Sequence, residues 1–278
     1  MGVTRSEVRP GAIGTINGIG CPPERQRSAV LATSSGVRRT AKSTGCLWLA
    51  LAVLSIPAML AAQVPRQPPN VLPPAASAKL ATSLDAAQPH PQHTWRDTPP
   101  FDAPDIVNAY IEIPRGERRK FEFAIGANSR AVDRVVPEDV GPYPVNYGFV
   151  PQTISYDGDP FDALVLGPPL PGGGVVRGRI VGLMLMEDEK GIDSKVVLSP
   201  VDRDGRATHQ LTPADQDRIG TYFDSYKRHE PNGFSDVPGW SSLQDGLDHV
   251  VMTHAFFRQC RTSGPCRIES VKQPSRRP

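Results

Sequence analysis

Residues 156–165 read Tyr-Asp-Gly-Asp-Pro-Phe-Asp-Ala-Leu-Val and place three carboxylates, Asp157, Asp159 and Asp162, between two apolar runs. Like charges this close repel one another, so they share a partly buried site only when cations hold them. Carboxylate oxygens are hard ligands that suit Mg²⁺, Mn²⁺ or Ca²⁺ better than softer metals. The stretch therefore indicates a divalent-cation site at the start of a strand.

Two other interpretations of these carboxylates are weaker. An EF-hand loop needs Gly at its sixth position and Glu at its twelfth, where this chain has Asp162 and Pro168. An acidic surface turn remains as the alternative, since Asp-Gly and Asp-Pro favour turns. It is disfavoured because Asp162 opens an apolar run, residues 161–166, where an unpaired charge is costly.

A second acidic cluster lies downstream, where Asp188, Glu189 and Asp193 are followed by Lys195. Together the two clusters indicate a multi-metal site acting on phosphate, which also needs cations and hydroxyls aimed at the substrate. The candidates for that role are Lys120, Arg134, Tyr143, Tyr147, Lys195, Tyr226 and Lys227. Each of these alone is more typical of a solvated charge or a core aromatic.

The composition disfavours other classes of site. The chain has 278 residues and a formal net charge of +2, so it shows no basic footprint for nucleic acid at the whole-chain level. Its four cysteines stand outside any CxxC or Cys/His spacing, which disfavours zinc. Residues 171–174, Pro-Gly-Gly-Gly, lack the Lys and Ser or Thr of a Walker loop and indicate a turn.

The N-terminal part divides into two segments. Residues 1–36 show no hydrophobic periodicity and are expected to form an unstructured extension. In residues 37–62, basic residues precede an uncharged run that ends in Ala-Ala, which is typical of a secretory signal peptide. An uncleaved membrane anchor and an ordinary apolar segment are the alternatives. We expect a periplasmic or secreted protein, with a cytoplasmic location as the alternative.

The next segment is rich in proline. Residues 63–104 contain ten prolines, and Ala, Gln and Ser fill much of the rest. Such a composition buries too little apolar surface to fold, so we predict a flexible, partly extended linker. The folded domain is then expected over residues 105–278.

That domain shows the pattern of a mainly β fold of the α+β class. Residues 106–113 and 120–125 alternate apolar and polar side chains, which predicts strands. Further short apolar runs are separated by Gly and Pro turns, as in a small antiparallel barrel. These runs are residues 147–150, 161–166, 175–186 and 195–198.

Two helices are predicted near the C-terminus. Residues 212–215, Thr-Pro-Ala-Asp, form a capping box with Pro at the first helical position. A second helix is predicted to start at Ser241, with Gln244 three residues on. Cys260 and Cys266 follow it, and in an exported protein we expect them to form a disulfide, with two free thiols as the alternative.

With these motifs in order, the chain resembles the soluble inorganic pyrophosphatases of the Mg²⁺-dependent, barrel-fold family (family I). The resemblance covers residues 106–258, a little over half of the chain. It rests on seven motifs, at residues 111–114, 120–122, 132–134, 143–148, 157–162, 188–195 and 226–227.

The resemblance implies an OB-like closed five-stranded antiparallel barrel with two flanking C-terminal helices. It implies Mg²⁺-dependent hydrolysis of pyrophosphate to two phosphates, with Mn²⁺ as a substitute, in a homo-oligomer that is commonly a hexamer. The implied metal ligands are Asp157, Asp162, Asp188 and Asp193. The implied catalytic residues are Asp159 as the base, Glu112 and Tyr147. The implied substrate-binding residues are Lys120, Arg134, Tyr147, Lys195, Tyr226 and Lys227, supported by Glu122, Tyr143 and Glu189.

Two alternatives to this function stay open. A phosphohydrolase of other phosphate anhydrides needs an apolar pocket for a base, and no obvious insertion supplies one. A catalytically inactive metal- or polyphosphate-binding protein is the other alternative. It is disfavoured because an abandoned site has no reason to keep costly clustered carboxylates. We expect contact with a membrane only through an N-terminal anchor.

Overall fold

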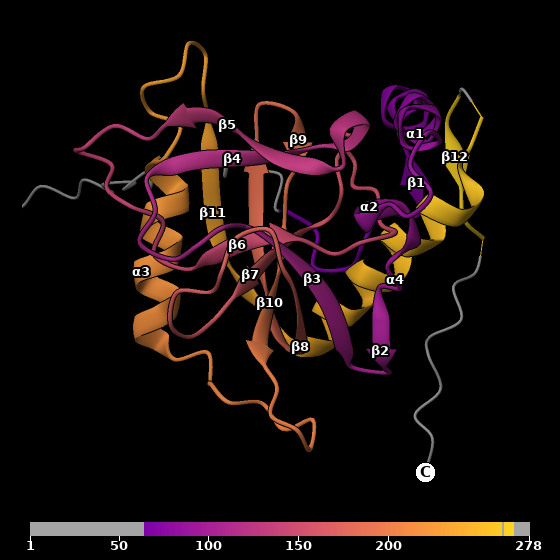
Figure 1. Ribbon diagram of the computed structural model, residues 1–278. Coiled ribbons are helices and arrows are strands. Elements are labelled where there is room, and N and C mark those ends of the chain that lie inside the picture. Colours follow the sequence, from indigo (N-terminus) through magenta and orange to yellow (C-terminus); the bar gives the residue numbers. More distant parts are fainter. Residues whose placement is uncertain (1–63, 263, 270–278) are drawn as a thin grey trace, which may run out of the picture. The chain divides into compact units, whose positions relative to one another are not determined.

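The computed structural model describes residues 64–262 and 264–269 (Figure 1). The predicted extension over residues 1–36 and the predicted signal segment over residues 37–62 lie outside this range. Within the described residues, no helix has the length and hydrophobicity needed to cross a bilayer. The helices are α1 (Pro74–Ala87), α2 (Thr94–Asp97), the 3-10 turn η1 (Ile125–Ala127), α3 (Pro213–Ser225) and α4 (Leu243–Gln259).

Strands dominate this part of the chain, so the α+β class with a mainly β content is confirmed. The strands before the Asp-rich turn are β1 (Val71–Leu72), β2 (Phe101–Ala103), β3 (Ile106–Ile113), β4 (Arg119–Ala124), β5 (Ser129–Val135) and β6 (Asn146–Phe149). Those after it are β7 (Asp162–Val165), β8 (Val175–Asp188), β9 (Gly191–Ile192), β10 (Lys195–Pro200), β11 (Ser235–Ser241) and β12 (Cys266–Arg267).

Five strands close into a hydrogen-bonded ring, in the order β3, β6, β7, β10 and β8, with β8 pairing again with β3. Four of the five pairings are antiparallel, but β7 and β10 run parallel. The expectation of an all-antiparallel barrel is therefore wrong at this pairing. The reason is the connection: β8 and β9 lie between β7 and β10, and such a long crossover returns the chain in its original direction.

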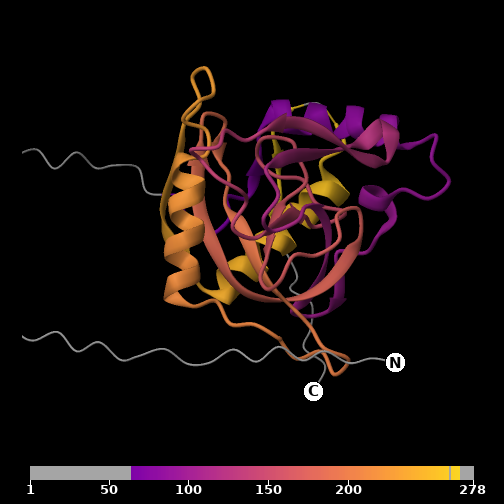
Figure 2. The same cartoon turned by 60° about the vertical axis from the view of Figure 1, so that its left-hand side comes forward.

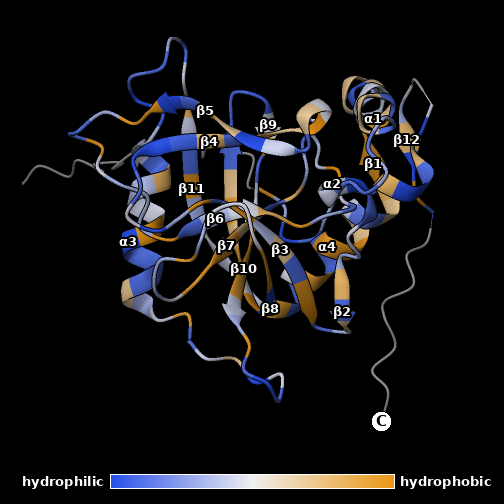
Figure 3. Ribbon diagram, in the orientation of Figure 1, coloured by the Kyte–Doolittle hydropathy of each residue, from blue (hydrophilic) through white to orange (hydrophobic). Residues whose placement is uncertain are grey.

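The ring is filled by apolar side chains and covered by α4. Val107 and Ile111 of β3 are fully buried together with Leu183 of β8 and Leu198 of β10. Helix α4 packs on β8 and β10 and adds Val250 to this cluster. Figure 3 shows β3 as strongly hydrophobic and α4 as mixed, whereas the β4–β5 hairpin is mostly hydrophilic. The hairpin is thus free to present charged residues.

Both predicted C-terminal helices are confirmed. In α3, Thr212 and Asp215 form the predicted capping box, and Pro213 is the first helical residue. Helix α3 packs against β11 at one side of the ring (Figure 2). Helix α4 starts one residue later than predicted, because its capping box is made by Ser242 and Asp245. The predicted Gln244 instead donates a hydrogen bond from its side chain to Asp248 at 2.9 Å.

The prediction of a flexible linker is wrong for residues 64–104. Leu72, Leu80 and Trp95 have no exposed surface and pack in one cluster with Phe256 and Phe257 of α4. The Trp95 indole donates a hydrogen bond to the Thr153 carbonyl at 3.0 Å. Composition misled here because the prolines stand between the folded pieces or at the start of α1, where proline is tolerated.

Residues near the C-terminal end of the described chain hold residues 64–104 in place. Strand β1 pairs with β12, so Leu72 lies opposite Cys266. Cys266 is bonded to Cys260 at the end of α4, which confirms the predicted disulfide. Figure 1 shows α1 and β1 beside β12 and α4. The proline-rich segment is thereby held to the rest of the fold near its start by β1 and near its end by Trp95.

Candidate active site

The predicted site residues converge on one cavity of about 430 Å³. Strand β3, the β4–β5 hairpin, the Asp157–Asp162 turn, the β8–β9 turn and the end of α3 all contribute to its wall. Of the fifteen predicted residues, all line the cavity except Arg134 and Lys195. Those that line it are Glu112, Lys120, Glu122, Tyr143, Tyr147, Asp157, Asp159, Asp162, Asp188, Glu189, Asp193, Tyr226 and Lys227.

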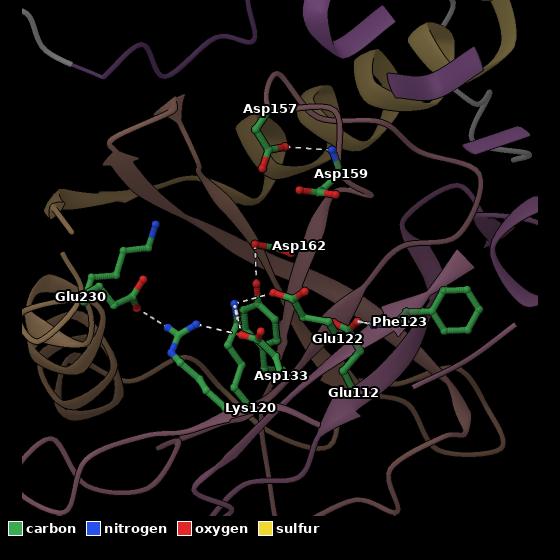
Figure 4. Close-up of polar contacts among 12 residues, drawn as sticks. Glu112, Lys120, Glu122, Phe123, Asp133, Asp157, Asp159, Asp162 and Glu230 are labelled. Atoms are coloured by element: carbon green, nitrogen blue, oxygen red, sulfur yellow. Dashed lines mark hydrogen bonds and ion pairs between the residues drawn. The ribbon is translucent and has the colours of Figure 1, made fainter. Parts of the chain in front are cut away.

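The Asp-rich turn aims its carboxylates by backbone geometry. Gly158 has φ +82°, a conformation that side-chain-bearing residues rarely adopt, and this allows a tight turn between Asp157 and Asp159. The Asp159 amide donates to Asp157 Oδ1 at 3.0 Å. In Figure 4, Asp162 lies between Asp159 and the group formed by Lys120, Glu122 and Glu112. Carboxylates that are far apart in the sequence thus face the same cavity.

Lysines neutralise these acidic clusters. Lys195, only 1% exposed, places its ammonium 2.6 Å from Asp162 Oδ2 and 2.9 Å from Asp193 Oδ1. Lys227 bridges the Asp188 carboxylate at 2.6 Å and the Glu189 carboxylate at 2.8 Å. Lys195 therefore lies beneath the cavity and pairs with two carboxylates, whereas its predicted place was against substrate.

Burial, and after it the crowding of negative charge, raises the pKa of several carboxyl groups. Burial and the nearby Asp162 charge raise the pKa of Glu112 to about 8. Burial raises the pKa of Asp193 to about 7, against the attraction of Lys195. Burial and the neighbouring Asp157 raise the pKa of Asp159 to about 6. A carboxylate with a pKa near 6 is ionised at neutral pH and suits proton acceptance.

Tyrosine hydroxyls form one side of the cavity. Tyr147 donates a hydrogen bond to Asp162 Oδ2 at 2.6 Å. Burial, reinforced by Asp162, holds the pKa of Tyr147 well above its usual value, so the phenol stays protonated. Tyr143 and Tyr226 are likewise buried, and burial raises the pKa of both. These groups therefore act as neutral hydrogen-bond donors.

The hairpin cations differ in where they point. Lys120 lines the cavity, and its ammonium lies 2.6 Å from Glu122 and 3.4 Å from Asp133. Arg134, opposite Lys120 in the hairpin, pairs instead with Glu230 and with Asp133. A guanidinium held by two carboxylates is not free for phosphate, so the predicted substrate contact requires Arg134 to leave Glu230.

Three charged residues that line the cavity were not assigned from the sequence: Lys79, Lys190 and Glu230. Lys190 stands inside the second acidic motif, and its ammonium lies 3.7 Å from Asp157. Lys79 belongs to α1, in the segment predicted to be a linker. The spacing of Ala76, Leu80 and Leu84 around it is helical and was the available signal.

The donor set fits a hard divalent cation. Five Asp carboxylates line one cavity, and each pairs with a lysine ammonium group that reduces their mutual repulsion. Among the described residues, no three acidic, His or Cys side chains are arranged to hold a metal ion. The carboxylates would have to turn from their lysine partners to do so, and oxygen donors of this kind suit Mg²⁺ or Mn²⁺.

A cavity that joins clustered carboxylates to lysines and phenols defines a site for a small, highly charged anion. Residues 109–258 match the protein family described as inorganic pyrophosphatase, which is more than half of the chain, and the chain belongs to that family. It is 40% identical over 164 residues to the inorganic pyrophosphatase of Thermus thermophilus, covering 56% of this chain and 93% of that protein. It is 37% identical over 155 residues to that of Saccharolobus solfataricus, covering 53% and 90%.

Solved structures agree with this assignment. The Thermus thermophilus inorganic pyrophosphatase structure aligns with a TM-score of 0.55 at 35% identity, covering 59% of this chain and 98% of that one. An inorganic pyrophosphatase from Coxiella burnetii aligns with a TM-score of 0.54 at 37% identity, covering 58% and 99%. Both matches cover little more than half of this chain.

Proposed function

We propose that this protein hydrolyses inorganic pyrophosphate to two phosphates, with Mg²⁺ as cofactor and Mn²⁺ as a substitute. Membership of the inorganic pyrophosphatase family carries the reaction. The observation that carries the site is the convergence of Asp157, Asp159 and Asp162 with Asp188 and Asp193 on one cavity. Pyrophosphate offers no organic group to grip, so a site for it works by neutralising charge and aligning a water.

We assign the metal to Asp157, Asp162, Asp188 and Asp193, and a supporting contact to Glu112. A bound divalent cation supplies neutralisation of the substrate's charge and makes water more acidic. Burying four carboxylates is costly on its own, and cation binding offsets that cost. This assignment therefore explains why the fold tolerates so many acidic groups around one space.

Asp159 is assigned as the proton acceptor. It stands at the cavity with its side chain 44% exposed, and a pKa of about 6 keeps it ionised at neutral pH. A water held between Asp159 and the substrate loses a proton to this carboxylate as it attacks phosphorus. Tyr147 donates a hydrogen bond to Asp162 and so keeps the Asp162 carboxylate oriented during this step.

Lys120, Lys227 and Tyr226 are assigned to the phosphate oxygens, because all three line the cavity. Arg134 joins them if substrate draws it from Glu230. Glu122, Tyr143 and Glu189 support these groups, and Lys195 acts from beneath by pairing with Asp162 and Asp193. Hydrogen bonds from charged donors to phosphate oxygens are stronger than those between neutral groups.

The proposal extends to the finer fold, the assembly and the location. We interpret the five-strand ring as an OB-like barrel and propose a homo-oligomer, with a hexamer by family resemblance. We also propose export, which the signal-like residues 37–62 and the Cys260–Cys266 disulfide support, since disulfides persist in oxidising compartments. Cell fractionation with antibody detection tests the location, and a protein found only in the cytoplasm contradicts it.

The activity test measures phosphate release by the full chain from pyrophosphate, with and without Mg²⁺, and from ATP in parallel. We expect fast release from pyrophosphate that depends on Mg²⁺, and little from ATP. Asp159→Asn should bind Mg²⁺ normally but lose turnover by about 10²–10⁴-fold, the usual contribution of a general base. Asp204→Asn, on an exposed turn away from the cavity, is the matched control. Binding of pyrophosphate without release by the native chain refutes the proposed reaction.

A further inference from the structure

Helix α1 contributes a residue to the active site from outside the family match. The match begins at residue 109, whereas α1 spans Pro74–Ala87. Lys79 of this helix lines the cavity, and its ammonium donates to Asp159 Oδ1 at 2.6 Å. The side chains of both residues keep nearly half of their exposure, 45% and 44%. The segment expected to be a linker therefore touches the residue assigned as proton acceptor.

The position of α1 over the Asp-rich turn is tightly determined. A Cβ atom placed on Gly158 would lie 2.8 Å from Lys79 Cδ and 3.1 Å from Ala76 Cα, closer than such contacts allow. Glycine at position 158 thus allows both the positive φ of the turn and the close approach of the helix. The helix therefore packs closely against the turn, and the fully buried Leu80 anchors it in the core.

Further contacts hold the start of this segment in place. The Tyr156 hydroxyl, at the head of the same turn, donates to the Pro69 carbonyl at 2.9 Å. Strand β1 pairs with β12, and the Asn70 side chain donates to the Ile268 carbonyl at 3.2 Å. A helix anchored at its start and along its buried face presents Lys79 at a defined place, which is what a positioning group needs.

Lys79 is the nearer of the two cations at Asp159. Lys190 lies 3.9 Å from Asp159 Oδ2 and 3.7 Å from Asp157, so it is shared between the two carboxylates. The Lys79 bond engages Oδ1, and the Oδ2 atom has only the more distant Lys190 ammonium beside it among the ion pairs of the described residues. A charge-assisted bond at 2.6 Å restricts the rotation of a half-exposed carboxylate, whose free rotation would spread its oxygens over several directions.

We propose that Lys79 is a positioning residue that holds the Asp159 carboxylate in its reactive orientation, so that residues 64–104 are part of the catalytic unit. This inference rests on the proposed pyrophosphate hydrolysis. It assigns a role to a segment that lies outside residues 109–258, the range of the family match. The same geometry predicts that Lys79 acts only through Asp159 and makes no contribution of its own to substrate affinity.

The test uses the full chain with Lys79→Met, Lys79→Arg and the matched control Asp85→Asn, an exposed charge on the same helix. Lys79→Met should lower kcat about tenfold, the order expected for a hydrogen bond to a charged group, with KM for pyrophosphate within about twofold. Lys79→Arg should recover most of the loss, because its guanidinium also reaches a carboxylate. The control should keep native kcat.

A second comparison separates positioning from other roles. In an Asp159→Asn background, Lys79→Met should cause no further loss of kcat, since the group it positions is already removed. An equal loss in both backgrounds, a raised KM or native kcat in Lys79→Met each overturns the proposal. Thermal unfolding of every variant shows that the fold is kept. If the native chain itself releases no phosphate from pyrophosphate, the proposed function fails first, which distinguishes the two failures.

Discussion

Replacing Lys195 by Met tests whether the buried ammonium balances two carboxylates. Methionine keeps most of the apolar stem and removes the charge that lies 2.6 Å from Asp162 and 2.9 Å from Asp193. Removing one partner of a buried ion pair costs about 3–5 kcal/mol, because the other partner stays buried without compensation. For a domain of this size, each kcal/mol shifts Tm by roughly 2–4 °C, so the expected fall is roughly 6–20 °C.

The assay is thermal unfolding followed by circular dichroism, at pH 8 with a chelator. At that pH the Asp193 carboxyl, whose pKa is about 7, is mostly ionised in the native protein. At pH 5.5 the loss should shrink, because a protonated carboxyl relieves the repulsion. Mg²⁺ should return part of the lost Tm at pH 8, since it takes over the neutralising role.

An exposed ion pair provides the control for this measurement. Arg206 lies 2.7 Å from Asp204, a similar separation, but both side chains are mostly exposed. Arg206→Met should therefore cost only about 0–1 kcal/mol. The argument that burial makes this lysine indispensable would be refuted by either of two results. One is a fall in Tm for Lys195→Met no greater than that of the control, and the other is a fall in Tm that is the same at pH 5.5 and pH 8.

Three further predictions concern the metal, pH and the disulfide. Asp162→Ala should raise the Mg²⁺ concentration for half-maximal activity at least tenfold in a titration, and an unchanged requirement removes Asp162 from the metal site. Without metal, Tm should fall as pH rises from 7 to 9. The pKa values of Glu112 and Asp193 in the folded state are raised to about 8 and about 7. The folded state therefore still binds protons that the unfolded state has already lost, and its stability declines as those protons leave. Glu112→Gln should flatten that slope, and a Tm that rises over this range contradicts the assignment. Cys260→Ser with Cys266→Ser should cost about 2 kcal/mol in urea unfolding, the value for closing so short a loop, and a cost near zero shows that the bond constrains nothing.

Local signals made much of the catalytic domain predictable. The Asp157–Asp162 turn holds three close carboxylates together with residues that favour turns. Its site residues could therefore be identified from this short stretch alone, without knowledge of what packs against it. Thr212 and Pro213 mark a helix start in the same local way, and α3 begins where they indicate. Alternation over residues 106–113 likewise reproduces the bounds of β3.

Relations between distant residues were not predictable from local patterns. The parallel pairing of β7 with β10 depends on how the intervening strands cross, which alternation does not encode. Arg134 was expected to face phosphate, but Glu230 competes for it from another part of the chain. Lys79 was missed because average composition concealed the few buried side chains of its segment, Leu72, Leu80 and Trp95.

The pairing of β1 with β12 has a consequence for biosynthesis. Residue 71 leaves the ribosome long before residue 267, so its strand has no partner during most of translation. Contacts that join such distant positions form late, since a long loop must close first. The β1–β12 pairing, which anchors the chain just before the helix that carries Lys79, therefore forms only after β12 has emerged. A nascent polypeptide interrupted before that point would carry every residue of the carboxylate cluster and still lack this anchor.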